Sequence, residues 1–199
     1  MVPSVTLQPK ASGALLLLDA NILYPIRLCD FFLTAAELQL IARPVVSDEI
    51  LNEAHRNVLA DRASAQKPLI DRRFANVRSF VDGADVAIPP RFNDTTIINT
   101  KDRHVLAAAR FHAVDFVVTE DARLRSEINR WRSAAPHDGQ PPVTLSANDF
   151  THRLVIELPD RVHDVVEAMA RRFRHPPRSF ADVLGGLRKS LPALDTLLS

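Results

Sequence analysis

Two short apolar runs, Ala14–Leu18 and Val114–Val118, stand out in a chain whose other apolar positions mostly recur with helical spacing. Runs of this length and composition are typical of strands that are covered on both faces in a parallel sheet. Val143–Leu145 fits a short edge strand, and Val86–Ile88 fits another short strand just before two prolines. The pattern therefore predicts a small, buried parallel sheet.

Apolar residues at intervals of three and four predict helices between these strands. Pro25 suits a helix start, Ser47 is a good N-cap, and Pro44 ends the helix before it. From Ser146 onward the chain is helical by pattern, with breaks at Pro159, Pro176–Pro177 and Pro192. The helices expected before that point are Cys29–Ile41, Ser47–Arg62, Pro68–Val81, Asp102–Ala113 and Ala122–Trp131.

Strands that alternate with helices predict an α/β fold, with a parallel sheet flanked by helices on both faces. We expect a loose N-terminal lead-in over residues 1–13, an α/β domain over 14–150 and a helical extension over 151–199. Arg91–Thr100 and Pro136–Pro142 are polar and are expected to be irregular loops.

Charge and cysteine content exclude several classes of protein. Lys and Arg total 25 against 24 Asp and Glu, so the net charge gives no indication of a nucleic-acid partner, although a basic rim around an acidic centre would also average to neutrality. The single cysteine, Cys29, excludes a disulfide framework and a cysteine-based zinc site. No apolar run approaches the roughly 20 residues of a membrane span. We expect a cytoplasmic protein.

The five glycines cannot be assembled into a phosphate-binding loop of either the G-x-G-x-x-G or the G-x-x-x-x-G-K-[ST] type. The chain also contains no H-E-x-x-H zinc helix and no G-x-S-x-G nucleophile elbow. Dinucleotide-binding, P-loop, zinc-protease and serine-hydrolase chemistry therefore lack their sequence motifs.

Acidic residues follow both of the main predicted strands. Asp19 comes directly after the first strand, and Asp121 lies three positions after the second. Such an aspartate is often a turn former or a helix cap. Because ligands of open α/β sheets bind at the carboxyl ends of the strands, two such acids on one parallel sheet favour a common site.

Two predicted helices add further acids. Glu53 lies on the apolar stripe of its helix, where a carboxylate is costly unless it is paired or bound to a metal, whereas Glu49 lies further from that stripe. Asp102 begins the next acidic segment, at the head of the stripe formed by Val105 and Leu106. The alternatives are that Glu53 pairs with an arginine and that Asp102 interacts only with the helix dipole.

Four carboxylates brought together would repel one another and their pKa values would rise unless a cation compensated. Oxygen ligands without thiolates or paired histidines favour Mg²⁺ or Mn²⁺. An ion of this kind beside a phosphodiester activates water and stabilises the charge that builds up on phosphorus. The acids therefore predict a phosphodiester hydrolase.

The chain resembles the PIN-domain family, and in particular the VapC-like toxin ribonucleases of toxin–antitoxin pairs. Four stretches carry the resemblance, in the family's order: Leu15–Pro25, Ser47–Val58, Lys101–Ala109 and Asp115–Asp121. His175–Leu187 also resembles the C-terminal extension of one branch of these proteins.

The resemblance implies a PIN-like sheet and a Mg²⁺- or Mn²⁺-dependent endoribonuclease with Asp19, Glu53, Asp102 and Asp121 as its catalytic and metal-binding acids. It assigns supporting roles to the polar residues Asn21 and Thr119. It further implies a homodimer and a cognate antitoxin. The chain departs from close relatives at Asn99-Thr100-Lys101, where they often carry a further acid, and at Cys29, where they often carry arginine.

Arginines near the acids are candidates for positioning RNA phosphates, namely Arg103, Arg123 and Arg125. The cluster Arg171–Arg174 is either a phosphate-binding patch or a solvated helix end. Two other functions remain open. One is a PIN-like module that binds RNA or a protein without catalysis. The other is a magnesium phosphatase of the haloacid-dehalogenase type, although Asn21 stands where that chemistry needs a second acid.

Overall fold

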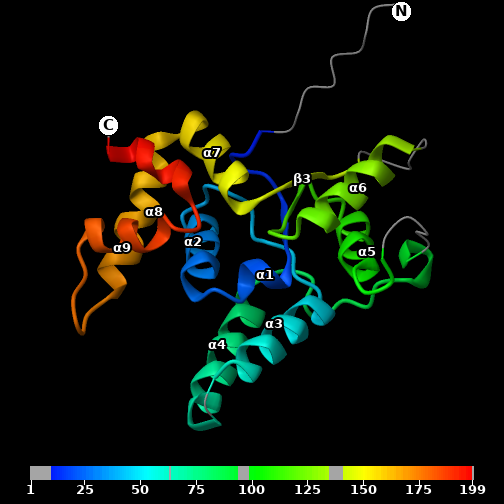
Figure 1. Cartoon of the computed structure of the whole chain (residues 1–199), viewed down its shortest axis with the longest axis horizontal. Helices are drawn as coiled ribbons and strands as arrows, with labels where there is room; N and C mark the ends of the chain where they lie inside the picture. The colour runs from blue at the N-terminus through cyan, green and yellow to red at the C-terminus, as the bar shows by residue number, and fades with distance from the viewer. Residues whose placement is uncertain (1–9, 63, 94–98, 135–140, 199) are drawn as a thin grey trace, which may run out of the picture.

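The computed structural model describes residues 10–62, 64–93, 99–134 and 141–198. Within them a parallel sheet has the order β1 (Leu16–Leu18), β2 (Phe116–Val118) and β3 (Val143–Leu145). In Figure 1 the sheet lies between α5 and α6 on one side and α2 and α8 on the other. The prediction of a mixed α/β fold with a parallel sheet is confirmed.

The sheet is central because its strands are apolar on both faces. Every residue of β1 and β2 is fully buried, as expected for parallel strands that are covered on both sides. Beyond β1 the edge is continued by single parallel bridges, from Leu17 to Val45 and from Val45 to Asp82.

The predicted strand Val86–Ile88 is wrong. The chain turns at Gly83, whose φ of +85° favours glycine. This turn leaves Asp82 rather than Val86 beside Val45, and Val86 is 46% exposed.

The helices between the strands begin close to their predicted starts. Ser47 caps α3 by accepting a hydrogen bond from the amide of Ile50. The first long helix ends at Glu37, earlier than predicted, because Gln39 adopts a φ of +58° and the amide of Leu40 turns back to the carbonyl of Ala35. The bounds are α1 Ala20–Leu23, α2 Ile26–Glu37, α3 Asp48–Ala60, α4 Lys67–Phe80, α5 Arg103–Phe111 and α6 Ala122–Ala134, with short 3₁₀ turns at Ser64–Gln66 (η1) and Pro90–Asn93 (η2).

The C-terminal region is helical, with breaks near the expected prolines. It consists of α7 (Ala147–Glu157), α8 (Pro159–Arg172), α9 (Phe180–Leu187) and the 3₁₀ turn η3 (Pro192–Leu198). This extension shares one hydrophobic cluster with the sheet and with α2. Phe150 of α7, for example, contacts Phe116 of β2 and Phe32 of α2, with ring centroids 5.3 and 6.0 Å apart.

Residues 10–13, at the end of the predicted lead-in, are held against α7. The amides of Ala11 and Ser12 both donate to the carboxylate of Glu157 at 2.9 Å, and Ala11 is fully buried. The remainder of the lead-in and most of the two predicted polar loops lie outside the described residues. None of the helices in the described ranges is long and apolar enough to span a membrane.

Candidate active site

Asp19 occupies the carboxyl end of β1 and is the N-cap of α1. Its Oδ1 accepts from the amide of Ala20 at 2.7 Å, while Oδ2 accepts from Asn21 Nδ2 at 2.8 Å and from Thr119 Oγ1 at 2.6 Å. The residue is only 7% exposed. Burial raises the pKa of this carboxyl, against the opposing effect of the Thr119 and Ala20 hydrogen bonds.

Asn21 and Thr119 connect the ends of the two central strands. Asn21 Nδ2 donates to Thr119 Oγ1 at 3.0 Å, and Asn21 Oδ1 accepts from the amide of Glu120 at 3.0 Å. Both ends of the Asn21 amide are therefore used to hold the β2 end against the β1 end. Asn21 is therefore a structural amide beside Asp19, at the position where a phosphatase of the haloacid-dehalogenase type would need a second acid.

Asp121 begins the segment that leads into α6. Its Oδ1 accepts from the amides of Arg123 and Leu124 at 2.8 and 3.0 Å, so part of its role is to cap that helix. Its own amide donates to Thr119 Oγ1 at 3.1 Å. No hydrogen bond within the described residues uses its second oxygen, Oδ2, which remains able to accept a ligand.

Glu53 projects from α3 and is half-buried. Burial raises the pKa of its carboxyl, repulsion from Asp19 adds to this effect, and His104 opposes it. His104 Nε2 lies 3.7 Å from Glu53 Oε2. Within the described residues no arginine forms an ion pair with Glu53, so the alternative explanation for its position is not supported. Glu49, one turn earlier, is exposed as expected.

Asp102 occupies the N-cap position of α5, but its side chain makes no capping hydrogen bond. Burial raises the pKa of this carboxyl, and repulsion from Asp121 and Asp19 raises it further. Asp102 therefore lies where the helix dipole favours a carboxylate, but no capping hydrogen bond holds its side chain. Its carboxylate also experiences the charges of the acids at the strand ends.

The four acids predicted from the sequence line one cavity of about 230 Å³. Among the described residues that line it, none is a lysine, an arginine or a histidine. The pKa of Asp19, of Glu53 and of Asp102 is raised in each case partly by another of the four. The cavity is lined by Asp19, Ala20, Asn21, Tyr24, Glu53, Asn57, Asp102, Val105, Asp121 and Leu124.

The donor set of this cavity consists of carboxylate and amide oxygens, with a phenol at its edge, which suits a hard divalent cation. Within residues 10–62, 64–93, 99–134 and 141–198, however, no three Asp, Glu, His or Cys side chains are grouped closely enough to hold an ion together. The chemistry of the donor set is that of a Mg²⁺ or Mn²⁺ site, and Mg²⁺ is commonly bound by only one or two carboxylates.

Glu127 lies near the site and was not among the candidate residues identified from the sequence. It is buried, accepts from the amide of Asn99 at 2.9 Å and pairs with Arg123 Nε at 2.9 Å. It thereby joins α6 to the segment that carries Asp102. In the sequence, Glu127 lies beside Leu124 and Ile128 on the inward stripe of α6, four residues after an arginine. This pattern would have indicated a buried glutamate paired with that arginine.

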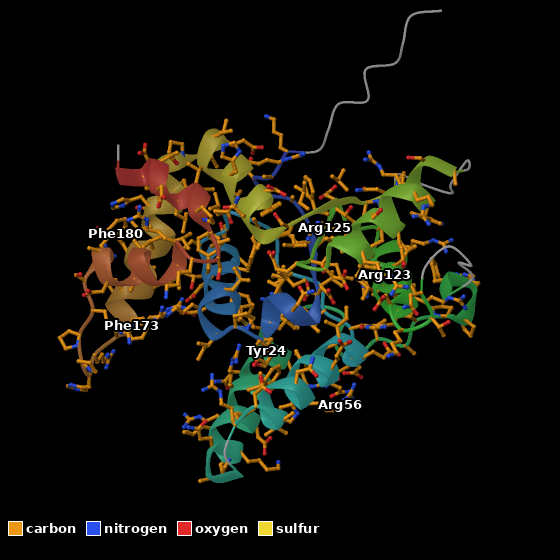
Figure 2. The ribbon with its side chains drawn as sticks, in the orientation of Figure 1. Tyr24, Arg56, Arg123, Arg125, Phe173 and Phe180 are labelled. Carbon is orange, nitrogen blue, oxygen red and sulfur yellow. The ribbon has the colours of Figure 1, made fainter. Side chains whose placement is uncertain are left out.

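The three arginines predicted to position RNA do not line the acidic cavity. Arg123 pairs with Glu127, and Arg125 Nη1 donates to the carbonyl of Thr119. Arg103 lies in the first turn of α5. In Figure 2 Arg123 and Arg125 are on the α5–α6 side of the molecule. Through these contacts Arg123 and Arg125 stabilise the segments around the site.

The Arg171–Arg174 cluster is partly neutralised within the chain. Arg172 forms ion pairs with Asp30 and Glu37 of α2, and Arg171 pairs with Glu167. These contacts favour a helix end that is anchored to its surroundings over a phosphate-binding patch at Arg171 and Arg172.

One family model matches the chain. Residues 147–197 match the model described as the VapC50 C-terminal domain, and these residues correspond to α7, α8, α9 and most of η3. The match points to the VapC toxin family, but it does not include the segments that carry the four acids. No curated protein and no solved structure matches the chain.

Proposed function

We propose that the protein is a metal-dependent endoribonuclease that acts as the toxin of a toxin–antitoxin pair. The observation that carries the proposal is the gathering of Asp19, Glu53, Asp102 and Asp121 around one cavity. The similarity of the C-terminal helices to the VapC50 C-terminal domain supports the toxin assignment independently, because it rests on a different part of the chain.

In this proposal Mg²⁺ or Mn²⁺ is held by a subset of the four acids. When bound, the ion supplies the activation of water and the neutralisation of phosphate charge that hydrolysis of a phosphodiester requires. Burial is the main cause of the raised pKa values of Asp19, Glu53 and Asp102, and repulsion from other acids of the cavity adds to it. A bound cation would offset both effects, because it favours the charged form of each carboxyl.

The chain's own contribution is to hold these carboxylates in place before the substrate arrives. Asp19 is fixed by Thr119 and Asn21, and Asp121 is fixed by the amides at the start of α6. Preorganisation of this kind avoids the reorganisation cost at the moment of reaction. Glu53 comes from α3 and Asp102 from the start of α5, so the four acids reach the cavity from different elements of the fold.

A toxin of this kind implies a cognate antitoxin protein that suppresses its activity, and we expect the enzyme to be a cytoplasmic homodimer. Expression of the chain alone should arrest bacterial growth, and co-expression of a small protein encoded by the neighbouring gene should relieve the arrest. Unimpaired growth at high expression of folded protein would contradict the toxin assignment.

The decisive experiment compares Glu53→Gln with Glu49→Gln, since the two positions lie on the same helix, one inside the cavity and one exposed to solvent. RNA cleavage is measured in Mg²⁺ and in Mn²⁺, with EDTA as the blank. We expect Glu53→Gln to lower the cleavage rate by about a hundredfold or more, equivalent to about 2.7 kcal/mol or more of transition-state stabilisation. Glu49→Gln should cleave like the wild-type protein, and equal cleavage by both variants would refute the assignment.

The same protein preparation distinguishes the ribonuclease from the two other functions, a non-catalytic module and a phosphatase. A non-catalytic module would show no saturable Mn²⁺ binding that is weakened by Glu53→Gln in calorimetric titration. A phosphatase would hydrolyse a small phosphomonoester and leave RNA intact. The contacts of Asn21 argue against this second reading, because both ends of its amide are committed to the strand ends.

A further inference from the structure

A second cavity of about 620 Å³ lies next to the acidic cavity. Tyr24, at the end of α1, lines both cavities. The second cavity is formed by the start of α2, by the facing ends of α3 and α4, and by the end of α9 with the residues after it. Figure 2 shows Tyr24 between α1 and the α3–α4 pair, close to the centre of the molecule.

A third cavity of about 660 Å³ continues from the second one. Ile26, Arg27 and Arg73 line both. The third cavity runs between α2, α4 and the extension, where its walls include Met169 and Val183. The second and third cavities, here called the basic groove, therefore lie in a row between the acidic cavity and the C-terminal extension, and neighbouring cavities share lining residues.

The groove is positively charged. The described residues that line the second cavity include three arginines, Arg27, Arg62 and Arg73, and no acid. The third cavity adds Arg172 and Arg178 together with two acids, Asp30 and Glu37. Both of these acids are paired with Arg172. The whole chain has a net charge of only +1, so the groove concentrates positive charge beside a cluster of negative charge.

Arg27 and Arg73, at the end of the groove that adjoins the acidic cavity, are positioned by hydrogen bonds to backbone carbonyls. Arg27 Nη1 donates to the carbonyl of Gly186 in α9 at 3.3 Å, and a Cβ at Gly186 would come within 2.4 Å of this guanidinium. Arg73 donates to the carbonyls of Leu23 and Tyr24. Within the described residues Arg27, Arg62 and Arg73 form no ion pair, so their charges are available to an anion.

Apolar and aromatic groups accompany these charges. Leu69 and Ile26, on the walls of the groove, are 70% and 64% exposed. The hydroxyl of Tyr24 donates to Asp61, which fixes the tyrosine at the junction with the acidic cavity. Positive groups beside exposed apolar and aromatic side chains are the pattern by which proteins track a single nucleic-acid strand, with charges on the backbone and flat groups against the bases.

We propose that the basic groove binds the single-stranded RNA that flanks the cleaved bond, with Arg27 and Arg62 contacting phosphates and Tyr24 marking the entry to the acidic cavity. This inference rests on the proposed ribonuclease function and extends it to the path of the substrate. It also gives the C-terminal extension a role, since α9 positions Arg27 and the extension forms one wall of the groove.

Electrostatics favours RNA over other anions as the occupant. A cavity lined by four carboxylates repels phosphates, so the flanking strand needs positive charge outside it. An acidic peptide would also be attracted to the arginines, but it would gain nothing from continuity with a carboxylate cavity. A phosphodiester strand uses both parts, with one phosphate at the acids and its neighbours along the groove.

The test measures RNA binding by the full chain carrying Glu53→Gln, which keeps the RNA intact. A labelled 20-nucleotide single strand of mixed sequence is titrated at several salt concentrations. Two double variants are compared. The groove pair carries Arg27→Gln and Arg62→Gln, and the control pair carries Arg72→Gln and Arg130→Gln, which lie outside the groove. Arg72 and Arg130 are exposed and line none of the three cavities, so both pairs remove the same charge.

The groove pair should bind RNA about 25-fold more weakly at 0.1 M salt, and its log–log salt slope should fall by about 1.4, because each phosphate contact on a single strand contributes about 0.7. The control pair should change affinity by less than about threefold. Equal losses in the two pairs would overturn the groove as the RNA path. A labelled 20-residue polyglutamate peptide that loses binding in the groove pair, while RNA binding is retained, would assign the groove to an acidic protein segment and would also overturn the proposal.

Failure of the groove can be told apart from failure of the proposed function. If the protein without substitutions cleaves RNA and the groove pair cleaves it with the same KM, the groove proposal is wrong and the ribonuclease stands. If the groove pair alone weakens RNA binding but no preparation cleaves RNA, the groove is supported and the ribonuclease is wrong.

Discussion

Thr119 Oγ1 donates a 2.6 Å hydrogen bond to Asp19 Oδ2 and so joins the carboxyl end of β2 to that of β1. The same hydroxyl oxygen accepts from Asn21 Nδ2 and from the amide of Asp121. One fully buried threonine therefore orders three polar residues of the acidic cavity. Its hydroxyl also favours the charged form of Asp19, which burial alone would disfavour.

Thr119→Val should lower the free energy of unfolding by about 1–3 kcal/mol, because it leaves buried polar groups without their partner. It should also raise the pKa of Asp19 further and reduce cleavage more than binding of RNA. Urea unfolding and the pH profile of cleavage measure the two effects. Thr119→Ser keeps the hydroxyl and serves as the control. A valine variant with unaltered stability and pH profile would show that this hydrogen bond does not organise the site.

Glu53→Gln should stabilise the metal-free protein at pH 7 by up to about 1 kcal/mol, a small value because the carboxylate is partly exposed and solvent screens it. The folded pKa of Glu53 is raised above its usual value of 4.5 by burial and by Asp19. The native state therefore holds the proton longer than the unfolded chain, and the wild-type protein loses stability as pH rises from about 4.5 through the raised pKa.

Unfolding in urea with EDTA from pH 4 to pH 8 tests this prediction. The wild-type protein should lose stability relative to Glu53→Gln as pH increases, and Glu49→Gln should follow the wild-type curve. Mg²⁺ or Mn²⁺ should recover the loss in the wild-type protein and in Glu49→Gln. A difference between wild type and Glu53→Gln that stays constant with pH would argue against charge repulsion in the cavity.

Glu127→Ala should cost about 1–3 kcal/mol, because the amide of Asn99 loses its acceptor and Arg123 loses its partner. The Asn99 amide, with Arg123, holds the pKa of Glu127 below its usual value. Its contribution is therefore present above about pH 4.5 and is lost as pH falls through the lowered pKa. Cleavage should also slow, since the segment that carries Asp102 is released.

Glu127→Gln keeps an acceptor for Asn99 and should lose less stability than the alanine variant. Ser126→Ala, an exposed position on the same helix, is the control for substitution in α6. Hydrogen exchange of the Asn99 amide provides a direct measurement. An unprotected Asn99 amide in the wild-type protein would show that this contact does not form in solution.

Phe150→Ala should destabilise the whole protein by about 3–5 kcal/mol, the usual cost of removing a buried aromatic ring. Phe150 is fully buried against Phe116 and Phe32, so the extension and the sheet should unfold together. Ile156→Ala, on the same helix but 69% exposed, should change stability by less than about 0.5 kcal/mol. Two separate unfolding transitions in the wild-type protein would contradict a shared core.

Local pattern was sufficient to predict most of the secondary structure. Continuous apolar residues are found in β1 and β2, because a strand that is buried on both faces has no polar side to encode. Ser47 marked the start of α3 because its hydroxyl satisfies an amide that the helix itself leaves open. The strand expected at Val86–Ile88 failed because Gly83 redirects the chain, and the direction of a turn is not contained in apolar spacing.

Position along the strands and helices also indicated that Asp19, Glu53, Asp102 and Asp121 would converge, since carboxyl ends of parallel strands share an edge. The sequence did not show which basic groups face outward to a ligand. Arg123 and Arg125 are near the acids in sequence, but they bind Glu127 and the Thr119 carbonyl. Arg27 and Arg62 face a common cavity because α9 returns to the start of α2 and the end of α3.

The sequence by itself determined the elements, the buried sheet and the set of acids, because each depends on residues within a few positions or on one rule of sheet geometry. Only the tertiary structure decided which charges are neutralised and which are exposed to a shared cavity. That outcome depends on contacts between segments a hundred residues or more apart, such as Arg27 with Gly186 and Thr119 with Asp19, and these pairings produce no periodic pattern along the chain.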